Sequence, residues 1–355
     1  MTMRQLAELA GVSSATVSLA LRGDPSISIE TRDRIKRLAI ENGYRTDAVV
    51  ASLMTRLRTA RVKRVCDKIA ILTSWRDRKE QREAKICNHN YIGMLAGIRQ
   101  RADELGYEIE EFWTKEPGLT AARLSKILYT RGIRGVILAP LGRAVGHLSL
   151  NWPYFATATL TYTVRKPDVH RVTHSHYNGI QLALRQLKHR GYKRPGFATM
   201  IDQNDRVKGA WLGGYLAYQQ TIRRTDRISP LLTSSLTFEE FRTWYEKSKP
   251  DVVISNLAAP FRSPLRMLLE MGCKVPVDVG YVSLDQVPSE QEGFKIIAGI
   301  DQLAFQQGAA TVDLVIKQVQ NNEFGLPRFP LTLHLDGVWR EGGTVRPPKL
   351  TASIS

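Results

Sequence analysis

The 355-residue sequence predicts an all-α headpiece followed by an α/β core of two doubly wound parallel-sheet subdomains. Three observations lead to this fold class. Residues 1–45 contain three short stretches in which apolar residues recur at helical spacing. From Lys68 onward the pattern changes to alternating strands and helices, which is typical of parallel sheets with helices on both faces. The alternation runs through two halves, so we expect two subdomains with a ligand cleft between them.

The headpiece is expected to hold three helices. The first spans residues 2–10 and ends at Gly11, because glycine readily adopts the left-handed conformation that closes a helix. Ser13 and Ser28 precede the next two apolar patterns and are the expected N-caps of the second and third helices. The third helix stops at Asn42-Gly43. Two helices joined by a turn of three or four residues around a glycine follow the helix-turn-helix plan.

The core pattern resolves into strands and helices in turn. Strands are expected at residues 69–73, 107–113, 135–139, 195–200, 251–255 and 279–284. Helices are expected at residues 91–105, 121–130, 179–190, 208–221, 239–247 and 263–271. Residues 336–346 are expected to supply the closing strand of the second subdomain.

Composition excludes several classes of protein. No run of about 18 apolar residues is present, which argues against a membrane span. Met1–Ala10 forms an amphipathic pattern rather than a signal peptide, so we expect a cytoplasmic protein. The three cysteines, Cys66, Cys87 and Cys273, form no CxxC pair, which favours idle thiols over a disulfide framework or a zinc site.

The net charge of +17 favours a polyanionic partner. Residues 1–65 hold 12 Lys and Arg against 6 Asp and Glu, a balance of +6, and the remainder holds 39 against 28, a balance of +11. The excess is therefore spread along the chain and does not locate a nucleic-acid site. A basic segment, residues 47–64, separates the headpiece from the core and is either a linker or a short helix.

Four segments carry a family resemblance. Residues 6–13, 16–18, 28–32 and 42–44 together resemble the DNA-binding headpiece of the lactose/galactose repressor (LacI/GalR) family. The rest of the chain resembles, more loosely, the periplasmic-binding-protein-like core of that family. The resemblance implies a transcriptional regulator, not an enzyme, that binds a palindromic double-stranded operator on the bacterial nucleoid. It implies a repressor that acts as a homodimer or a higher oligomer, without a cofactor.

The resemblance also implies a domain organisation. Residues 1–46 would form the headpiece, and residues 47–66 the hinge helix and linker. Residues 67–350 would form the effector-binding and dimerisation core. Within this core, one subdomain would take about 67–165 and 299–325, and the other about 166–298 and 326–350.

In that family the second headpiece helix enters the major groove. By alignment, DNA contacts fall on Ser13, Ser14, Ala15, Thr16, Ser18, Leu19, Arg22, Thr31 and Leu53. Ser14, Ala15 and Leu19 match the base-reading positions, and none offers a bidentate amide or guanidinium, so thymine methyls, one hydroxyl and DNA shape should carry the readout. Leu53 matches the hinge leucine that wedges into the minor groove. The alternatives are ordinary surface hydroxyls and a Leu53 that packs on its own headpiece.

The core offers a weaker set of candidates. Arg206 begins an Arg-x-x-Gly match, Asn256 ends one strand pattern and Asp285 ends another, all at positions that face the effector cleft in the family. An arginine and a carboxylate at strand ends suit a small polar or sugar-like effector. The alternative is an ion pair between Arg206 and Asp285. Ser175 and Leu257 depart from the residues usual in the family.

Other functions find less support in the sequence. A solute-binding receptor would use the same core but requires a secretion signal. The sequence contains no GxxxxGK[ST], HExxH or GxSxG motif, so it gives no support to P-loop, zincin or hydrolase readings. His174 and His176 lack a third metal ligand, and we expect them to be part of a strand face. Trp211, Tyr215 and Tyr218 recur at helical spacing and are expected in the core.

Overall fold

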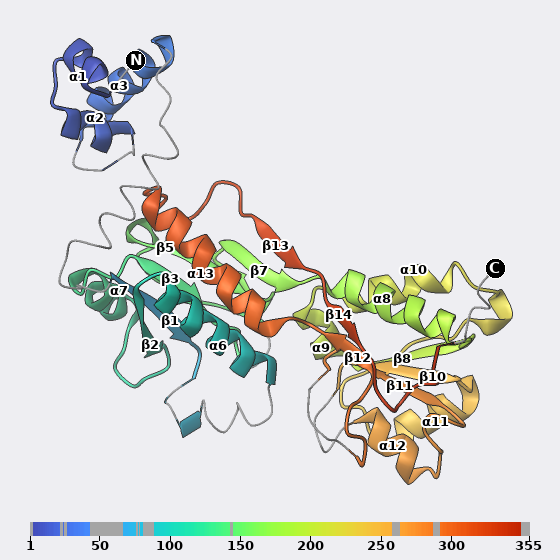
Figure 1. The fold of residues 1–355 in the computed structure, drawn as a ribbon. Coiled ribbons are helices and arrows are strands. Elements are labelled where there is room, and N and C mark those ends of the chain that lie inside the picture. The colour runs from blue at the N-terminus through green and yellow to red at the C-terminus, as the bar shows by residue number, and fades with distance from the viewer. Residues whose placement is uncertain are drawn as a thin grey trace.

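The computed structural model describes residues 3–21, 24, 27–42, 67–75, 77, 79–80, 89–142, 145–257, 263–286 and 292–348. Arg22, Leu53, Cys66, Cys87 and the segment 47–64 lie outside the described residues. In the described part the chain forms a small helical headpiece and two α/β subdomains (Figure 1).

The headpiece consists of α1 (Met3–Ala10), α2 (Ser14–Leu21) and α3 (Ile29–Glu41). Its core is small and wholly apolar, with Leu6, Val17 and Ile35 fully buried where the three helices meet. All three helices are too short to be stable alone, so this shared core must hold them together. The three predicted helices are confirmed.

The predicted caps are also present. Ser13 Oγ accepts from the backbone N–H of Thr16 at 3.1 Å, and Ser28 Oγ accepts from that of Thr31 at 3.3 Å. Gly11 has a φ of 65°, the left-handed conformation that ends α1. The Gly11 conformation and the Ser13 cap together produce the tight turn between α1 and α2. This turn sets the angle between the two helices.

The first subdomain contains a six-stranded parallel sheet in the order β13-β7-β5-β3-β1-β2. Its strands are β1 (Asp67–Thr73), β2 (Tyr107–Trp113), β3 (Gly135–Leu138), β5 (Ala156–Leu160), β7 (His170–His174) and β13 (Thr332–Leu335). Helices α6 (His89–Glu104) and α13 (Ala304–Gln320) cover one face, and α7 (Ala121–Thr130) covers the other. A two-stranded ribbon of β4 (Gly146–His147) and β6 (Val164–Lys166) and a short 3-10 helix (Trp152–Tyr154) lie between β3 and β7 in the chain.

The second subdomain repeats the plan with the order β14-β12-β11-β10-β8-β9, in which only β14 is antiparallel to its neighbour. Its strands are β8 (Pro195–Met200), β9 (Leu231–Thr233), β10 (Val252–Ser255), β11 (Gly280–Ser283), β12 (Gly299–Asp301) and β14 (Val338–Arg340). Its helices are α8 (His176–His189), α9 (Ile201–Arg206), α10 (Ala210–Gln219), α11 (Phe238–Ser248) and α12 (Pro264–Glu270), with a 3-10 turn at Arg224–Asp226. Helices α8 and α10 cover one face of the sheet, and α11 and α12 the other.

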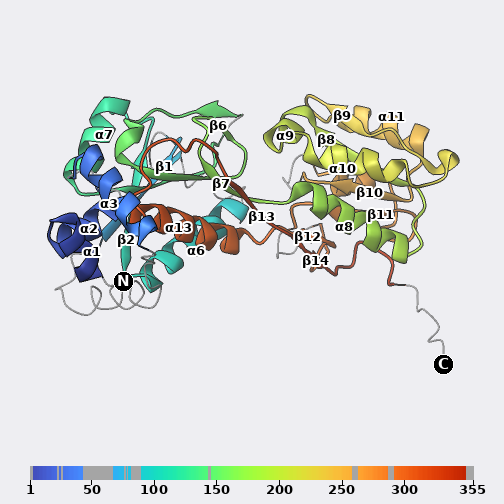
Figure 2. The same cartoon turned by 90° about the horizontal axis from the view of Figure 1, so that it is seen from above.

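The chain crosses between the two sheets three times, after β7, after β12 and after β13 (Figure 2). The expected exchange points near residues 165, 298 and 325 therefore need correction. Strands β7 and β13 belong to the first sheet, and β12 belongs to the second. These strands are three to five residues long. Their sequences do not indicate which neighbouring strand each one pairs with, because sheet membership is decided by backbone hydrogen bonds between distant segments.

The tightest helix contact of the first subdomain joins α6 to α13. A Cβ added at Gly97 would lie 1.9 Å from Phe305 O, and one added at Gly308 would lie 2.1 Å from Met94 O. Two backbones approach this closely only when neither helix has a side chain at the crossing point. Glycines in both helices therefore hold α13 against α6.

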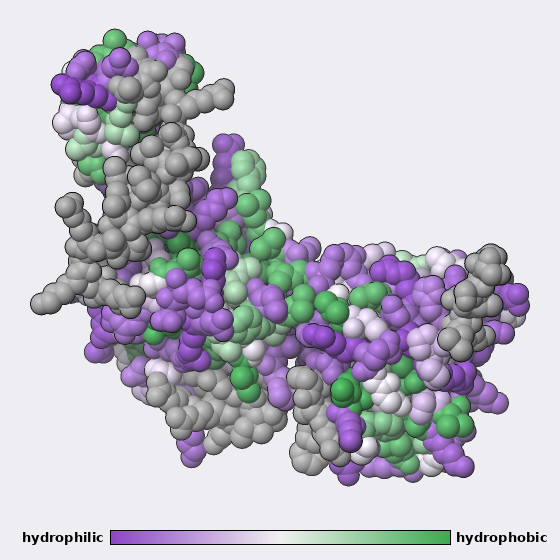
Figure 3. All heavy atoms as spheres, in the orientation of Figure 1, coloured by the Kyte–Doolittle hydropathy of each residue, from purple (hydrophilic) through white to green (hydrophobic). Residues whose placement is uncertain are grey.

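The surface reflects the charged composition. The face seen in Figure 3 is mostly hydrophilic, with apolar side chains along the segment from α13 into β13, where Phe329, Leu331 and Leu333 are exposed. Among the described residues, no helix is both long and apolar enough to span a bilayer.

We expect Gly97→Ala to lower the free energy of unfolding by about 2 kcal/mol, because its methyl group would force α6 and α13 apart. Gly213→Ala is the matched control, since Gly213 is an exposed position in α10 whose added Cβ meets nothing within 4 Å. The control should be neutral or stabilising by up to about 1 kcal/mol. Urea denaturation of both variants tests this, and equal stabilities would contradict the role given to the crossing.

Candidate functional site

Helix α2 has one buried and one open face. Val17 and Ala20 are buried in the headpiece, whereas Ser14 and Ala15 at the start of the helix are exposed. Thr16, Ser18 and Leu19 are half-buried. The structure therefore presents the predicted base-reading start of the helix to solvent, with Leu19 less open than Ser14 and Ala15.

Hydroxyl groups gather at the starts of α2 and α3. The Ser13 and Thr16 hydroxyls lie 2.9 Å apart, and Ser28 Oγ donates to Thr31 Oγ1 at 2.8 Å. The first turn of α2 contains no acidic residue. The N–H groups and hydroxyls of such a turn suit a phosphate oxygen, so Ser13 and Thr16 have the chemistry of contacts to the DNA backbone. Thr31 offers a similar hydroxyl, but the first turn of α3 also contains Glu30.

In the core, the structure brings Arg206, Asn256 and Asp285 together around one cavity of about 130 Å³, which we call the cleft cavity. Both subdomains contribute to it. Its lining residues are Asn90, Tyr91, Met94, Pro140, Thr161, Thr163, His176, Gln203, Arg206, Val207, Trp211, Asn256, Asp285 and Gln302. Residues more than 190 positions apart thus meet because the carboxyl ends of strands from both sheets point toward this gap.

Arg206 is the last residue of α9, and its guanidinium reaches across to the first subdomain. Its Nη2 donates to Leu141 O at 3.1 Å. Burial lowers the pKa of Arg206, because a charged guanidinium loses hydration there. Arg206 therefore brings a positive charge and several N–H donors to the edge of the cavity.

Asp285 follows β11 and is held from the opposite side. Asn90 Nδ2, in α6 of the first subdomain, donates to its carboxylate. Desolvation raises the pKa of Asp285 to about 6, against the hydrogen bond from Asn90, which lowers it. The alternative of an Arg206–Asp285 ion pair receives no support from these contacts, since each of the two side chains bonds to a group of the other subdomain.

Asn256 follows β10 and is buried. Its Oδ1 accepts from Thr199 Oγ1 at 2.5 Å, which fixes the orientation of the amide and leaves its nitrogen to donate. With Asp285 as an acceptor and Arg206 as a donor, the cavity presents both kinds of hydrogen-bonding group. This mixture suits a ligand with several hydroxyl groups.

Of the fourteen lining residues, the sequence analysis assigned only Arg206, Asn256 and Asp285 to the cleft, and two of the others carry polar groups that bear on ligand binding. Asn90 reaches the cavity only because α6 abuts the second subdomain, a long-range contact that has no local sequence signal. Trp211 packs in the core, as expected, but it also lines the cavity, and its buried Nε1 has no hydrogen-bond partner among the described residues. An unsatisfied buried N–H is costly, so a ligand acceptor placed there would be favoured.

His174 and His176 lie where the chain first crosses between the sheets. Their rings meet edge to face with centroids 5.0 Å apart, and His176 also packs on Trp211 at 4.9 Å. Burial lowers the pKa of His174 to about 4 and that of His176 well below its ordinary value, so both are neutral at pH 7. Among the residues described, no group of three His, Cys, Asp or Glu side chains could hold a metal ion.

Comparison with known proteins adds an independent line of information. Residues 2–47 match the family of bacterial regulatory proteins of the lacI type. The HTH-type transcriptional regulator CelR of Thermobifida fusca is 24% identical over 363 residues, covering 96% of this chain and 98% of the relative.

Two solved structures share the fold at 18% identity and a TM-score of 0.55. One is a CelR–cellobiose complex, covering 97% of this chain and 99% of that one. The other is a lac repressor dimer bound to operator and an anti-inducer, covering 98% of this chain and 99% of that one.

The raised pKa of Asp285 predicts a pH-dependent stability. Between about pH 4 and pH 6 the folded chain holds a proton that the unfolded chain has released, so this group's contribution to stability falls as pH rises. We expect the wild type to lose stability relative to Asp285→Asn between pH 4.5 and pH 7 in urea titrations. Asn90→Ala should move this transition to higher pH, and a stability difference independent of pH would contradict the assignment.

Proposed function

We propose that this chain is a transcriptional regulator of the lactose/galactose repressor type, which represses transcription by binding a palindromic operator as a dimer under the control of a small polar effector. The match of residues 2–47 to the lacI family and the similarity to CelR over most of the chain support the proposal. The observation that carries the proposal is the headpiece surface. Helix α2 packs through Val17 and Ala20 and leaves Ser14 and Ala15 exposed, as a helix that enters the major groove must.

The chemistry of α2 defines how the operator is read. Ser14 supplies one hydroxyl, while Ala15 and Leu19 supply only apolar surface, which suits thymine methyl groups. Thr16 and Ser18, with Ser13 and Thr31, would contact phosphates and set the register. Arg22 and Leu53 remain proposed as a phosphate contact and a minor-groove wedge on the basis of the family resemblance. Specificity should therefore depend strongly on DNA shape.

A dimer follows from the geometry of recognition. One helix-turn-helix reads half of a palindrome, and two copies are spaced by about one helical turn or a multiple of it. The lac repressor structure that shares this fold is itself a dimer bound to operator. A transcription factor of this type acts on the nucleoid, and we assign no enzymatic step to it.

The cleft cavity is the proposed effector site. Arg206 and Asn256 would donate to ligand oxygens, and Asp285 would accept from ligand hydroxyls, with Asn90 closing the site from the first subdomain. These groups suit a neutral, sugar-like molecule, and the related CelR structure contains cellobiose. Because Arg206 and Asn90 each bond across the gap, a ligand that competes for them would change the angle between the subdomains.

The proposal is tested by selecting bound duplexes from a random pool with the purified protein. Recovery of a palindromic sequence, with affinity that falls steeply as salt rises, is the expected result. A solute-binding receptor built on the same core would show neither sequence preference nor salt dependence.

Ser14→Asp separates DNA binding from folding. An acidic residue in the first turn stabilises a helix, whereas on the groove-facing surface it repels phosphates. We expect operator affinity to fall at least about tenfold, or ~1.4 kcal/mol, with no loss of headpiece stability. Ile40→Glu is the control, because it introduces one negative charge at an exposed position near the end of α3. Equal affinities of both variants in gel-shift titrations would exclude α2 as the recognition helix.

Arg206→Met tests the effector site. A hydrogen bond to a charged group is worth about 1.5–3 kcal/mol, so affinity for a neutral sugar that binds the wild type should fall roughly tenfold or more. Sugars including cellobiose are screened by calorimetry, and the selected operator is titrated in parallel. A variant that keeps full sugar affinity would move the effector site away from the cleft.

A further inference from the structure

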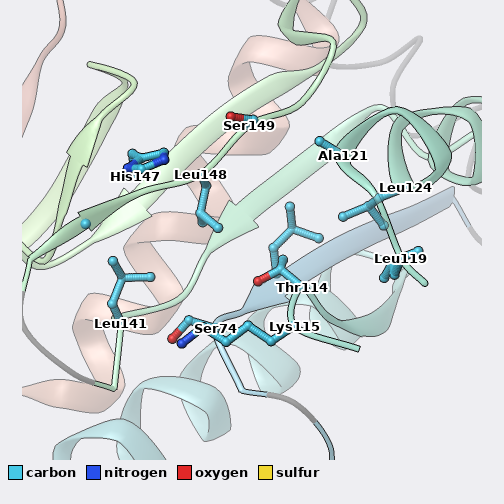
Figure 4. Close-up of a pocket in the computed structure, with 12 residues that line it drawn as sticks. Ser74, Thr114, Lys115, Leu119, Ala121, Leu124, Leu141, His147, Leu148 and Ser149 are labelled. Atoms are coloured by element: carbon cyan, nitrogen blue, oxygen red, sulfur yellow. The ribbon is translucent and has the colours of Figure 1, made fainter. Parts of the chain in front are cut away.

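A second cavity, of about 420 Å³, lies in the first subdomain and is called here the lobe cavity. Figure 4 shows it between the ends of the sheet strands, the start of α7 and the segment 146–149. Its lining residues are Leu72, Ser74, Thr114, Lys115, Leu119, Ala121, Leu124, Leu141, Gly146, His147, Leu148 and Ser149. None of them lines the cleft cavity.

The lobe cavity lies where open α/β sheets bind ligands. Ser74 follows β1 and Thr114 follows β2, and Leu141 lies shortly after β3, so three neighbouring strands end at the cavity. Ligands of such sheets bind outside the carboxyl ends of the strands. Leu141 separates this cavity from the cleft, since its side chain lines the lobe cavity and its carbonyl accepts from Arg206.

The polar lining is suited to an anion. Lys115 and His147 are its only residues with basic side chains, and it contains no Asp or Glu. Neither side chain has an ion-pair or hydrogen-bond partner within the described ranges. Figure 4 shows Lys115 extending along one side of the cavity next to Ser74, with His147 on the other. An unpaired ammonium facing a pocket without carboxylates favours a negatively charged guest.

The hydroxyl groups also have hydrogens to donate. Ser74 Oγ accepts from the backbone N–H of Gly142 at 3.2 Å, so its own hydrogen is left for a ligand. Ser149 adds a second hydroxyl at the rim. Thr114 instead donates to Thr73 O at 2.8 Å. The Ser74 hydroxyl beside the Lys115 ammonium can bond the oxygens of one carboxylate or phosphate group, whereas Ser149 lies on the other side of the cavity (Figure 4).

The remaining wall is apolar. Leucine side chains form most of it, namely Leu72, Leu119, Leu124, Leu141 and Leu148. An inorganic ion would leave this surface wet, whereas a short carbon chain would cover it. The two kinds of wall together define a ligand with a charged head and an apolar body.

We propose that the lobe cavity is a second small-molecule site, separate from the effector cleft, that binds a small organic anion. The anion carries a carboxylate or phosphate group bonded by Lys115 and Ser74, and a short apolar chain packed on the leucines. The site would let the regulator sense an acidic metabolite independently of the neutral molecule in the cleft.

Calorimetry with two matched pairs of probes tests this site on the full-length protein. The pairs are butyrate with butyramide, and butyl phosphate with 1-butanol. At least one anion should bind, and at least about tenfold more tightly than its neutral partner. The pair that responds identifies the head group as carboxylate or phosphate. Absence of saturable binding of both anions would overturn the proposal.

Variants locate the binding. Lys115→Met should reduce anion affinity about tenfold, and Ala121→Leu, which fills the cavity from the start of α7, should reduce it without a change of charge. Lys126→Met, an exposed position in α7 outside the lining, is the matched charge control and should bind as the wild type does. Melting temperatures confirm that each variant is folded.

Two results would contradict the location. Equal losses in Lys115→Met and Lys126→Met would show that the anion responds only to the general positive charge of the protein. A loss in Asn256→Ala together with full affinity in Lys115→Met would place the anion in the cleft instead. The DNA-binding role is tested separately, by affinity for the operator recovered in the selection experiment. The outcome of the anion experiments does not affect that test.

Discussion

The threefold passage of the chain between the two sheets is the constraint on which the rest of the core depends. Because the chain leaves the first sheet after β7, returns after β12 and leaves again after β13, neither subdomain is a continuous segment. Three connections side by side restrict the relative motion of the subdomains to bending about them. They also turn the carboxyl ends of both sheets toward one gap, where Arg206, Asn256 and Asp285 meet.

Hydrogen bonds across that gap join the two subdomains. Arg206 bonds to the Leu141 carbonyl, and Asn90 bonds to Asp285, so polar groups of each subdomain are satisfied by the other. A ligand with hydroxyl groups offers the same atoms different partners. If the cleft binds the proposed effector, that ligand would compete with the hydrogen bonds between the subdomains. The effector would then have a different affinity for each angle between the subdomains.

The headpiece differs from the two subdomains because only a very small apolar core holds it together. Leu6, Val17 and Ile35 are fully buried in this core. Ser14 and Ala15 at the start of α2 do not pack in the core and are exposed. The exposed groups there, Ser14 and Ala15, are small and offer no bidentate amide or guanidinium for a base edge. In the proposed DNA-binding role, such a helix would obtain affinity from phosphates and specificity from DNA shape, which is consistent with the net charge of +17.

The sequence by itself determined the local features: the three headpiece helices, the caps at Ser13 and Ser28, and most core elements. Strands 107–113 and 195–200 and helix 121–130 have the expected bounds, because periodicity, caps and glycines act within a few residues. It also singled out Arg206, Asn256 and Asp285, through a family resemblance. Only the tertiary structure decided which sheet takes β7, β12 and β13, and that Asn90 and Trp211 reach the cleft. Those outcomes depend on contacts between residues up to about two hundred positions apart, whose pairing energy is not encoded in any local pattern.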